Sequence, residues 1–391
     1  LPPSVPLASG LPTAAPGLPQ AAEAEVEALA SALAAAERPL LLLGRTGRGA
    51  EAWAARVALA ERLGAGVITD IRTAAAFPTD HPAHLGAPGF NFDPIQQAAL
   101  READVIVALD WIDPATGLSK AAARTGPQAQ AFVVTLDHLA HRGWTKDGFA
   151  LPPYGRWLAG TPDDVVPRLL ARLGSGARPG WRPSPKDAET ADAIPSLGSD
   201  SAYGRLAGAI EALRESRPVT LTRLPLGWPA GALEFRAPLD YLGRDGGEGL
   251  ASGPGMAVGA ALALKGTGRL PVAVLGDGDL LMGLTALWTA ANQQAPLLVI
   301  VAANGVYGND VVHQERIARQ RGRPVENKWV GQTFTEPRPD FTQLASGQGA
   351  VFAARADVFA PDLEEVLRAA AEAAAGRGGV ALVEVTIPAE S

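Results

Sequence analysis

Short apolar runs alternate with amphipathic stretches along most of the chain. In the first part the pattern predicts helices and strands in turn: a helix over 20–37, a strand over 39–44, a helix over 50–63, strands over 66–69, 105–109 and 131–136, and helices over 94–103 and 161–173. Later the alternation restarts: helices over 201–215, 255–264, 280–292 and 361–375, and strands over 219–222, 272–275, 297–303 and 380–385. Such alternation is typical of parallel sheets covered on both faces. The predicted fold class is therefore α/β, with two doubly wound, Rossmann-like parallel-sheet domains.

Two stretches without apolar periodicity divide the chain. Residues 1–19 hold six prolines and are predicted to form an extended linker on a surface. Residues 174–200 are rich in Gly, Pro and Ser and are predicted to link the two domains. We therefore expect a central domain over 20–173 and a second domain over 201–391.

Composition narrows the range of functions. The 391 residues carry a net charge of −7 and no cysteine, which argues against a nucleic-acid binder and excludes disulfides and thiolate sites. Four arginines between Arg316 and Arg323 are interpreted as a solvated helix end. The longest apolar run, Ala295–Ala303, is too short to cross a membrane. A cytoplasmic location is our expectation.

The most informative segment joins an apolar strand to a helix. Asp277 stands between two glycines directly after the strand over 272–275, and Asn304 directly follows the next strand. Ligands of open α/β sheets bind at the carboxyl ends of strands. A carboxylate, an amide oxygen and a nearby backbone carbonyl suit Mg²⁺ or Ca²⁺, with diphosphate oxygens completing the coordination. The alternative is a tight turn in which Asp277 caps the following helix.

Other known ligand-binding motifs do not fit the sequence around their candidate residues. A calcium loop would need a ligand near Leu281, where the chain has leucine. The glycines of 253–259 resemble a dinucleotide fingerprint but do not follow a strand, so we interpret them as a turn that opens a close-packed helix. The chain also contains no P-loop motif.

Gly276-Asp277-Gly278, followed after 25 residues by Asn304, resembles the thiamine-diphosphate motif. The likeness extends to 248–261, 339–345 and 380–385, which resemble the diphosphate-binding domain of acetolactate-synthase-like and benzaldehyde-lyase-like enzymes. Residues 20–173 resemble the central domain of the same enzymes. The resemblance implies thiamine diphosphate and Mg²⁺ as cofactors, and a carboligase, lyase or decarboxylase that acts on 2-oxo acids or acyloins.

The resemblance also implies roles for individual residues. Metal ligands would be Asp277, Asn304 and the backbone carbonyl of Val306. The residues beside the cofactor would be Gly276, Gly278, Asp279, Tyr307 and Gly308. Leu250 falls where the family has a large apolar side chain that bends the cofactor into its reactive form; an ordinary core leucine is the alternative interpretation.

The helix after Asn304 lines the substrate pocket in these enzymes. Gln314 falls where biosynthetic acetolactate synthases have tryptophan, which leaves room for a lyase, a decarboxylase or another carboligase. His313 is a candidate acid or base because its pKa is near neutral, and a surface histidine is the alternative.

Family members also use a glutamate from a pyrimidine domain, and residues 1–5 resemble the end of that domain. We expect the glutamate to come from a separate polypeptide or from a segment removed from this one, and this chain alone to bind cofactor weakly and turn nothing over. Because family sites form between chains, a dimer or a dimer of dimers is expected. Two alternatives stay open: a catalytically silent cofactor-binding or assembly subunit, and a dinucleotide-dependent dehydrogenase.

Weaker signals lie in the central domain. The pairs His81/His84 and His138/His141 have spacings that would suit a metal, but neither has a further ligand in the sequence pattern. The glycine-rich turn over 44–49 follows a strand and could hold an anionic cofactor, and some relatives bind FAD or an adenine nucleotide in this domain. A plain tight turn is the favoured interpretation, so FAD is not favoured.

Overall fold

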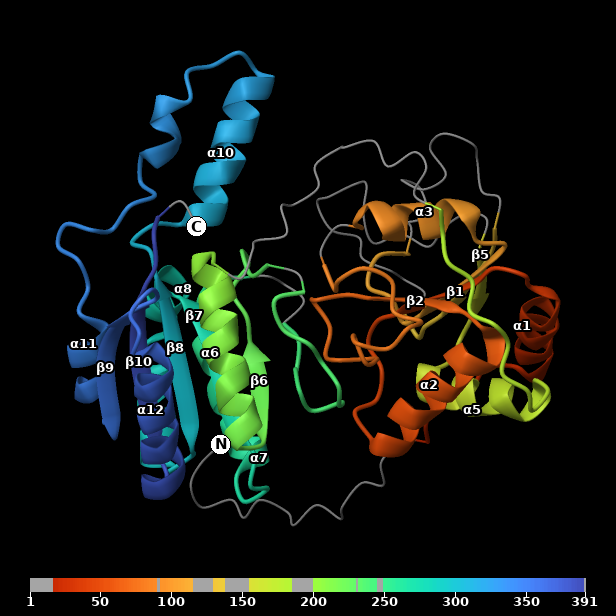
Figure 1. Ribbon diagram of the computed structural model, residues 1–391, viewed down its shortest axis with the longest axis horizontal. Helices are drawn as coiled ribbons and strands as arrows, with labels where there is room; N and C mark the ends of the chain where they lie inside the picture. Colours follow the sequence, from red (N-terminus) through yellow and green to blue (C-terminus); the bar gives the residue numbers. More distant parts are fainter. Residues whose placement is uncertain are drawn as a thin grey trace, which may run out of the picture.

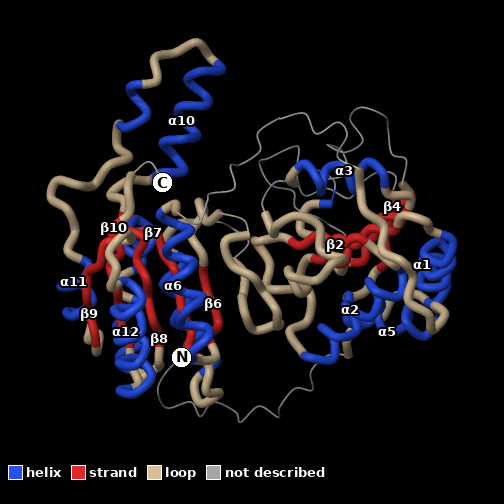
Figure 2. Tube along the Cα trace, in the orientation of Figure 1, coloured by secondary structure: helices blue, strands red, loops and turns tan. Residues whose placement is uncertain are grey.

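The computed structural model describes residues 17–89, 92–114, 129–137, 155–184, 200–229, 231–244 and 249–389. Two parallel sheets dominate these residues, and each has helices on both faces (Figures 1 and 2). The α/β fold class with two parallel-sheet domains is therefore confirmed. Within the described residues, no helix is both long and apolar enough to cross a membrane.

The first sheet has the strand order β2-β1-β3-β4-β5. Its strands are β1 (Pro39–Leu43), β2 (Gly66–Thr69), β3 (Val105–Leu109), β4 (Gln130–Val134) and β5 (Gly155–Leu158). Its helices are α1 (Glu23–Ala35), α2 (Ala50–Leu63), α3 (Pro94–Glu102) and α5 (Pro162–Arg172).

The leucines of β1 show why this sheet is covered on both sides. Leu41 and Leu43 pack in a core with residues of α1, α2 and α5, whereas Leu40 and Leu42 pack with residues of α3. Successive side chains of a strand point to opposite faces, so a run of leucines requires a helical layer on each face.

The start of the predicted 174–200 linker lies against the central domain. Arg178 donates to the carbonyl of Ala36 at the end of α1 (3.1 Å), and the indole of Trp181 donates to the carbonyl of Pro39 (2.7 Å). Residues 185–199 of this linker, and residues 1–16 of the N-terminal one, lie outside the described residues.

The second sheet has the order β6-β7-β8-β10-β9. Its strands are β6 (Val219–Arg223), β7 (Leu270–Gly276), β8 (Leu297–Ala303), β9 (Phe352–Asp357) and β10 (Val380–Thr386). Its helices are α6 (Ala202–Ser216), α7 (Ser252–Leu264), α8 (Asp277–Gly283), α9 (Ala286–Asn292), α10 (Gly308–Gln320), η1 (Glu326–Trp329), α11 (Phe341–Gly347) and α12 (Leu363–Arg377).

This sheet is also buried on both faces. Val272 and Val274 of β7 belong to the core formed with α6 and α12, and Ala273 and Leu275 belong to the core formed with α7, α9 and α11. Figure 1 shows α6 and α12 in front of the strands, with α10 and η1 projecting beyond the strand ends. The carboxyl ends of β7 and β8 thus meet at the sheet edge from which this α10–η1 arm rises.

The structure corrects two sequence predictions and adds two strands. The helix predicted over 280–292 is two helices, α8 and α9, separated by a turn at Leu284 and Thr285. The glycine-rich turn predicted at 253–259 is already helical, because α7 begins at Ser252. Strands β5 and β9 were not predicted: they are partly exposed edge strands that lack a continuous apolar run.

Candidate functional site

The ends of β7 and β8 lie side by side. The two strands pair in parallel, with Gly276 opposite Ala302, so Asp277 and Asn304 leave the sheet at neighbouring positions. The Asp277 carboxylate joins the two ends directly, because its Oδ2 accepts a hydrogen bond from the backbone N–H of Gly305 (2.6 Å). The predicted juxtaposition of the two strand ends is therefore present in the fold.

Asp277 is a buried carboxylate, 3% exposed. Its Oδ1 accepts from the N–H of Gly278 (2.9 Å), and no side chain caps helix α8, so the simple helix-cap alternative does not describe it. Burial raises the pKa of Asp277, and the N–H groups of Gly305 and Gly278 oppose that rise. A nearby cation would offset the cost of burying the charge.

The oxygen donors at this edge fit a hard divalent cation. Asp277 Oδ1 accepts the N–H of Gly278 and Oδ2 accepts the N–H of Gly305, and both oxygens keep further lone pairs. Asn304 Oδ1 accepts a hydrogen bond from the N–H of Val306 (3.1 Å). This bond fixes the side-chain amide of Asn304 so that its oxygen faces the loop that contains Val306. Carboxylate, amide and backbone carbonyl oxygens form the donor set that Mg²⁺ takes in proteins.

Glycine is required at position 278 by a tyrosine ring. A Cβ at Gly278 would lie 2.3 Å from Cε1 of Tyr307, the residue that precedes α10. The Tyr307 ring packs on Phe334 with 5.1 Å between ring centroids, and its N–H donates to the carbonyl of Gln332 (2.9 Å). Tyr307 is therefore held over the turn that follows β7.

Asp279 faces the start of α7. It is 6% exposed, and its Oδ1 accepts from the N–H of Ala251 (2.7 Å). Ala251 has a left-handed backbone (φ 75°), a conformation that costs energy for alanine and that this hydrogen bond helps to hold. Because Ala251 follows Leu250 directly, Asp279 fixes the backbone that presents Leu250.

A cavity of about 780 Å³ opens over these strand ends. It is lined by all of the predicted metal and cofactor residues: Leu250, Gly276, Asp277, Gly278, Asp279, Asn304, Val306, Tyr307 and Gly308. Leu250 is 40% exposed, so the alternative that it is an ordinary core leucine is wrong. A large apolar side chain exposed inside a polar-floored cavity is suited to contact a ligand.

Two family models match the chain. The model described as thiamine pyrophosphate enzyme, central domain, matches residues 26–134, and the model described as thiamine pyrophosphate enzyme, C-terminal TPP binding domain, matches residues 226–385. The chain belongs to the thiamine pyrophosphate enzymes. Its two parallel-sheet domains correspond to the central and the C-terminal cofactor-binding domains of this family.

Similarity to individual proteins supports the same family. The chain is 29% identical over 350 residues to an acetolactate synthase of Mycobacterium avium, which covers 84% of this chain and 52% of that protein. It is 31% identical over 163 residues to a benzoylformate decarboxylase of Pseudomonas aeruginosa, covering 41% and 29%. A solved benzoylformate decarboxylase of Polynucleobacter necessarius shares the fold, with a TM-score of 0.67 at 22% identity over 100% of this chain and 68% of that one. The chain spans about half the length of the acetolactate synthase it matches.

The structure adds residues to the cavity of this member of the thiamine pyrophosphate enzyme family that the sequence pattern did not reveal. Tyr203 at the start of α6 and Arg223 at the end of β6 line its floor, and Lys328 and Trp329 of η1 line its outer wall. Burial, followed by the negative charge of Asp277, raises the pKa of Tyr203 to about 12. Arg223, 2% exposed, lies 3.9 Å from Asp279 (Nε to Oδ2). The available signal was that Arg223 directly follows the predicted strand over 219–222.

The structure does not bring His313 and Gln314 into the cavity wall. Among the described residues, the wall formed by α10 includes Val311, Val312 and Glu315. The His313 ring is exposed, and its Nδ1 lies 2.9 Å from a guanidinium nitrogen of Arg316. The assignment of His313 and Gln314 to substrate contacts stays a prediction.

The central-domain histidines lie in different surroundings. His84 is buried with its Nε2 2.9 Å from the hydroxyl of Thr69, and His81 Nε2 lies 3.3 Å from a Glu61 oxygen. Within the described residues no group of three or more His, Asp or Glu side chains is placed to hold a metal. His138 and His141 lie outside the described residues.

His84 should make stability fall in mild acid. Burial lowers its pKa to about 4, whereas an unfolded histidine titrates near 6.5, so the unfolded chain binds more protons between these values. The contribution of His84 is complete above pH 6.5 and is lost as pH falls toward 4. We expect roughly 2 kcal/mol less unfolding free energy at pH 5 than at pH 7 from this residue, measured by urea denaturation.

Two variants assign this pH dependence to His84. His84→Gln should remove this part of the pH dependence, whereas His81→Gln, which changes the partly exposed neighbour, should leave most of it. Equal slopes in wild type and His84→Gln would contradict the assignment.

Carboxylate side chains contact the turn over 44–49. Arg45 pairs with Asp110 (3.0 Å) and with Asp137, and the N–H of Gly47 donates to Asp163 (3.3 Å). A Cβ at Gly44 would lie 2.1 Å from the carbonyl oxygen of Asp110, which explains the glycine at that position by backbone packing. An anionic nucleotide would meet these carboxylates, so no observation here favours FAD.

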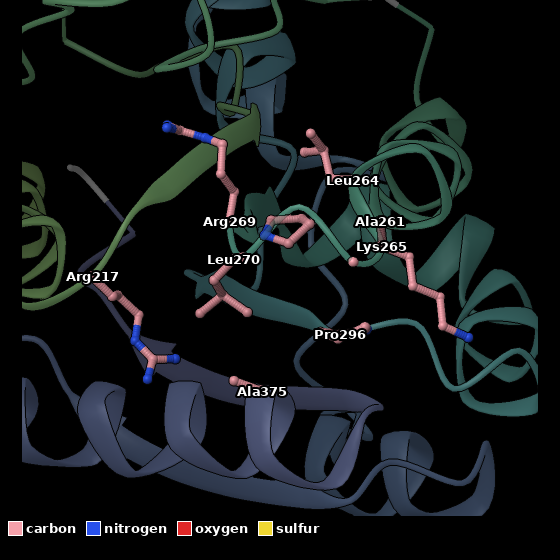
Figure 3. Close-up of a pocket in the computed structure, with 11 residues that line it drawn as sticks. Arg217, Ala261, Leu264, Lys265, Arg269, Leu270, Pro296 and Ala375 are labelled. Atoms are coloured by element: carbon pink, nitrogen blue, oxygen red, sulfur yellow. The ribbon is translucent and has the colours of Figure 1, made fainter.

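A second cavity, of about 320 Å³, lies at the opposite edge of the C-terminal sheet (Figure 3). Leu270 and Pro296, at the amino ends of β7 and β8, mark this edge, and three cations surround it. Arg217 donates to the carbonyl of Ala371 (2.9 Å), Lys265 to that of Gln293 (2.7 Å) and Arg269 to the hydroxyl of Thr220 (2.7 Å). Because these cations are engaged within the fold and the edge is opposite to Asp277, this cavity is not part of the candidate site.

Proposed function

We propose that this chain provides the diphosphate- and Mg²⁺-binding part of a thiamine-diphosphate-dependent enzyme that makes or breaks a carbon–carbon bond next to a carbonyl. The substrates would be 2-oxo acids or acyloins. One observation carries the proposal: Asp277 and Asn304 place oxygen donors on adjacent strand ends inside one cavity. The names of the relatives, acetolactate synthase and benzoylformate decarboxylase, support this substrate class.

The chain's own residues would hold, shape and shield the cofactor. Asp277, Asn304 and the carbonyl of Val306 would hold Mg²⁺, and Gly276, Gly278 and Gly308 would let the diphosphate approach the backbone. When bound, thiamine diphosphate supplies a nucleophilic carbon and a sink for negative charge. Leu250 would pack against it, and Tyr307 would close the wall of the cavity beside Gly278.

We also propose that a pyrimidine-type domain, on another chain or segment, supplies the glutamate that such enzymes use. Apolar side chains are exposed on the two helices that follow Asp277: Met282 of α8 is 54% exposed and Trp288 of α9 is 57% exposed. Large apolar side chains that are exposed in this chain suit contact with another domain. A dimer or a dimer of dimers is the assembly we propose.

A cofactor titration tests the proposed function. Calorimetry should detect binding of thiamine diphosphate in the presence of Mg²⁺ and little without it, because Asp277 and Asn304 would hold the metal and their oxygens alone would repel an anionic diphosphate. Titrations with NAD⁺ serve as the comparison. Binding of NAD⁺ with no response to thiamine diphosphate and Mg²⁺ would instead favour the dehydrogenase alternative.

Turnover assays on the same purified chain distinguish an enzyme from a catalytically silent subunit. The chain alone should bind cofactor weakly and turn over no 2-oxo acid. Addition of a pyrimidine-domain chain should produce turnover. Cofactor-dependent turnover by the chain alone would refute the need for a partner, and lack of turnover with the partner bound would favour the assembly-subunit alternative.

A further inference from the structure

The cavity has two chemically different ends. Its inner end is the strand edge with Asp277 and Asn304, and its outer wall is formed by Val312 and Glu315 of α10 and by Lys328 and Trp329 of η1. Figure 1 shows α10 and η1 standing together beyond the strand ends. A ligand held at the inner end would extend toward this outer wall.

The α10–η1 arm is basic although the chain is acidic. Residues 308–329 contain five basic and three acidic residues, a net charge of +2, in a chain of net charge −7. Among the described residues that line the cavity, Arg223 and Lys328 are the cations. Arg223 is 2% exposed on the floor beside Asp279, whereas the Lys328 side chain is 23% exposed on the outer wall. Lys328 is thus the cation that an entering ligand can reach.

The charge of Lys328 is only partly matched by its carboxylate partner. Glu315 pairs with Lys328, and it also accepts from Nε (3.0 Å) and a terminal nitrogen (2.6 Å) of Arg319. Hydrogen bonds from Lys328 and then Arg319 lower the pKa of Glu315, so this carboxylate stays ionised between two cations. The group carries a net charge of +1, and Arg319 continues to balance Glu315 if Lys328 turns toward a ligand.

Apolar side chains line the same cavity as this cation. The Lys328 ammonium lies 5.1 Å from the centroid of the Trp329 ring, and Val312 of α10, which also lines the cavity, is 69% exposed. A cavity that combines a cation with aromatic and aliphatic side chains suits a ligand with an apolar body and an anionic end.

We propose that Lys328 is a specificity-determining residue that binds an anionic group at the far end of the substrate, away from the carbonyl that reacts. This inference rests on the proposed function, because it takes the reacting end of the substrate to lie at the cofactor. The anionic group is a carboxylate, as in a dicarboxylic 2-oxo acid, or a phosphate, as in a coenzyme A derivative. A lysine ammonium acts as a point charge, so it can bind either a carboxylate or a phosphate.

Binding measurements on the full chain with thiamine diphosphate and Mg²⁺ test this role. The ligands are 2-oxoglutarate, 2-oxopentanoate, which has the same carbon chain without the second carboxylate, and coenzyme A. Wild type should bind 2-oxoglutarate or coenzyme A at least about tenfold more tightly than 2-oxopentanoate. Preference for 2-oxoglutarate identifies a carboxylate tail, and preference for coenzyme A a phosphate tail.

Variants assign the effect to Lys328. Lys328→Met keeps the stem beside Trp329 and should remove the preference, while Lys328→Arg should retain it. The matched control Arg321→Met removes an exposed cation of the same arm that is not among the cavity-lining residues, and should also retain it. Equal or undetectable affinity for tailed and untailed ligands in wild type, or an undiminished preference in Lys328→Met, overturns the proposal. Failure of thiamine diphosphate and Mg²⁺ to bind wild type overturns the proposed function instead, so the two failures are distinct.

Discussion

Asp277→Ala should weaken Mg²⁺-dependent binding of thiamine diphosphate by at least about 100-fold, or about 2.8 kcal/mol. The variant removes the charged member of the proposed donor set, and the amide of Asn304 cannot replace its charge. The carboxylate is 3% exposed, so little water is present to take its place. Calorimetric titration of thiamine diphosphate at fixed Mg²⁺ measures the loss.

Folding needs its own control, because the same carboxylate accepts from the N–H groups of Gly278 and Gly305. Leaving both N–H groups without this acceptor would destabilise the turn itself. Asn304→Ala, at a half-buried residue, provides a second test and should also lower affinity. Asp357→Ala is the matched control: this exposed aspartate ends β9 of the same sheet and is not among the cavity-lining residues. If Asp277→Ala folds and binds as tightly as wild type, the metal assignment is wrong.

The sequence predicted the buried strands well because their signal is local. β7 and β8 lie in the middle of a sheet covered on both faces, so nearly every residue in them is apolar. The edge strand β9 pairs on one side with β10, and its mixed sequence, which includes Arg355, carries no such pattern. Leucines continue through the turn at Leu284 and Thr285, so periodicity alone joined α8 and α9 into one helix.

The candidate site was predictable where it depends on consecutive strand ends. Asp277 and Asn304 are linked by the rule that neighbouring parallel strands end at one edge, and spacing along the chain reveals them. Tyr203 and Lys328 reach the cavity from a helix start and from the projecting arm. Their positions depend on how α6 and η1 pack, which no short sequence window contains.

Gly278→Ala should lower the unfolding free energy by about 1 to 3 kcal/mol and weaken binding of thiamine diphosphate at least about tenfold. The added methyl group would lie 2.3 Å from Cε1 and 2.9 Å from Cδ1 of Tyr307, so the ring must move. Phe334 packs against that ring and resists the movement. A displaced ring would alter the cavity wall beside the proposed diphosphate position. Thermal and urea denaturation without ligand measure the first effect, and titration measures the second.

Gly276→Ala is the matched control for stability, since it places the same methyl group two residues earlier in the same turn. Nothing lies within 4 Å of a Cβ at Gly276, and its backbone (φ −67°, ψ 150°) suits alanine, so stability should change by less than about 0.5 kcal/mol.

Combining Gly278→Ala with Tyr307→Ala tests whether the clash between the added methyl group and the Tyr307 ring causes the loss of stability. Tyr307→Ala alone loses the contact with Phe334, but in the double variant the methyl group no longer meets a ring, so the combined loss should be smaller than the sum of the single losses. Additive losses, or equal stability of Gly278→Ala and Gly276→Ala, would show that Tyr307 does not dictate the glycine.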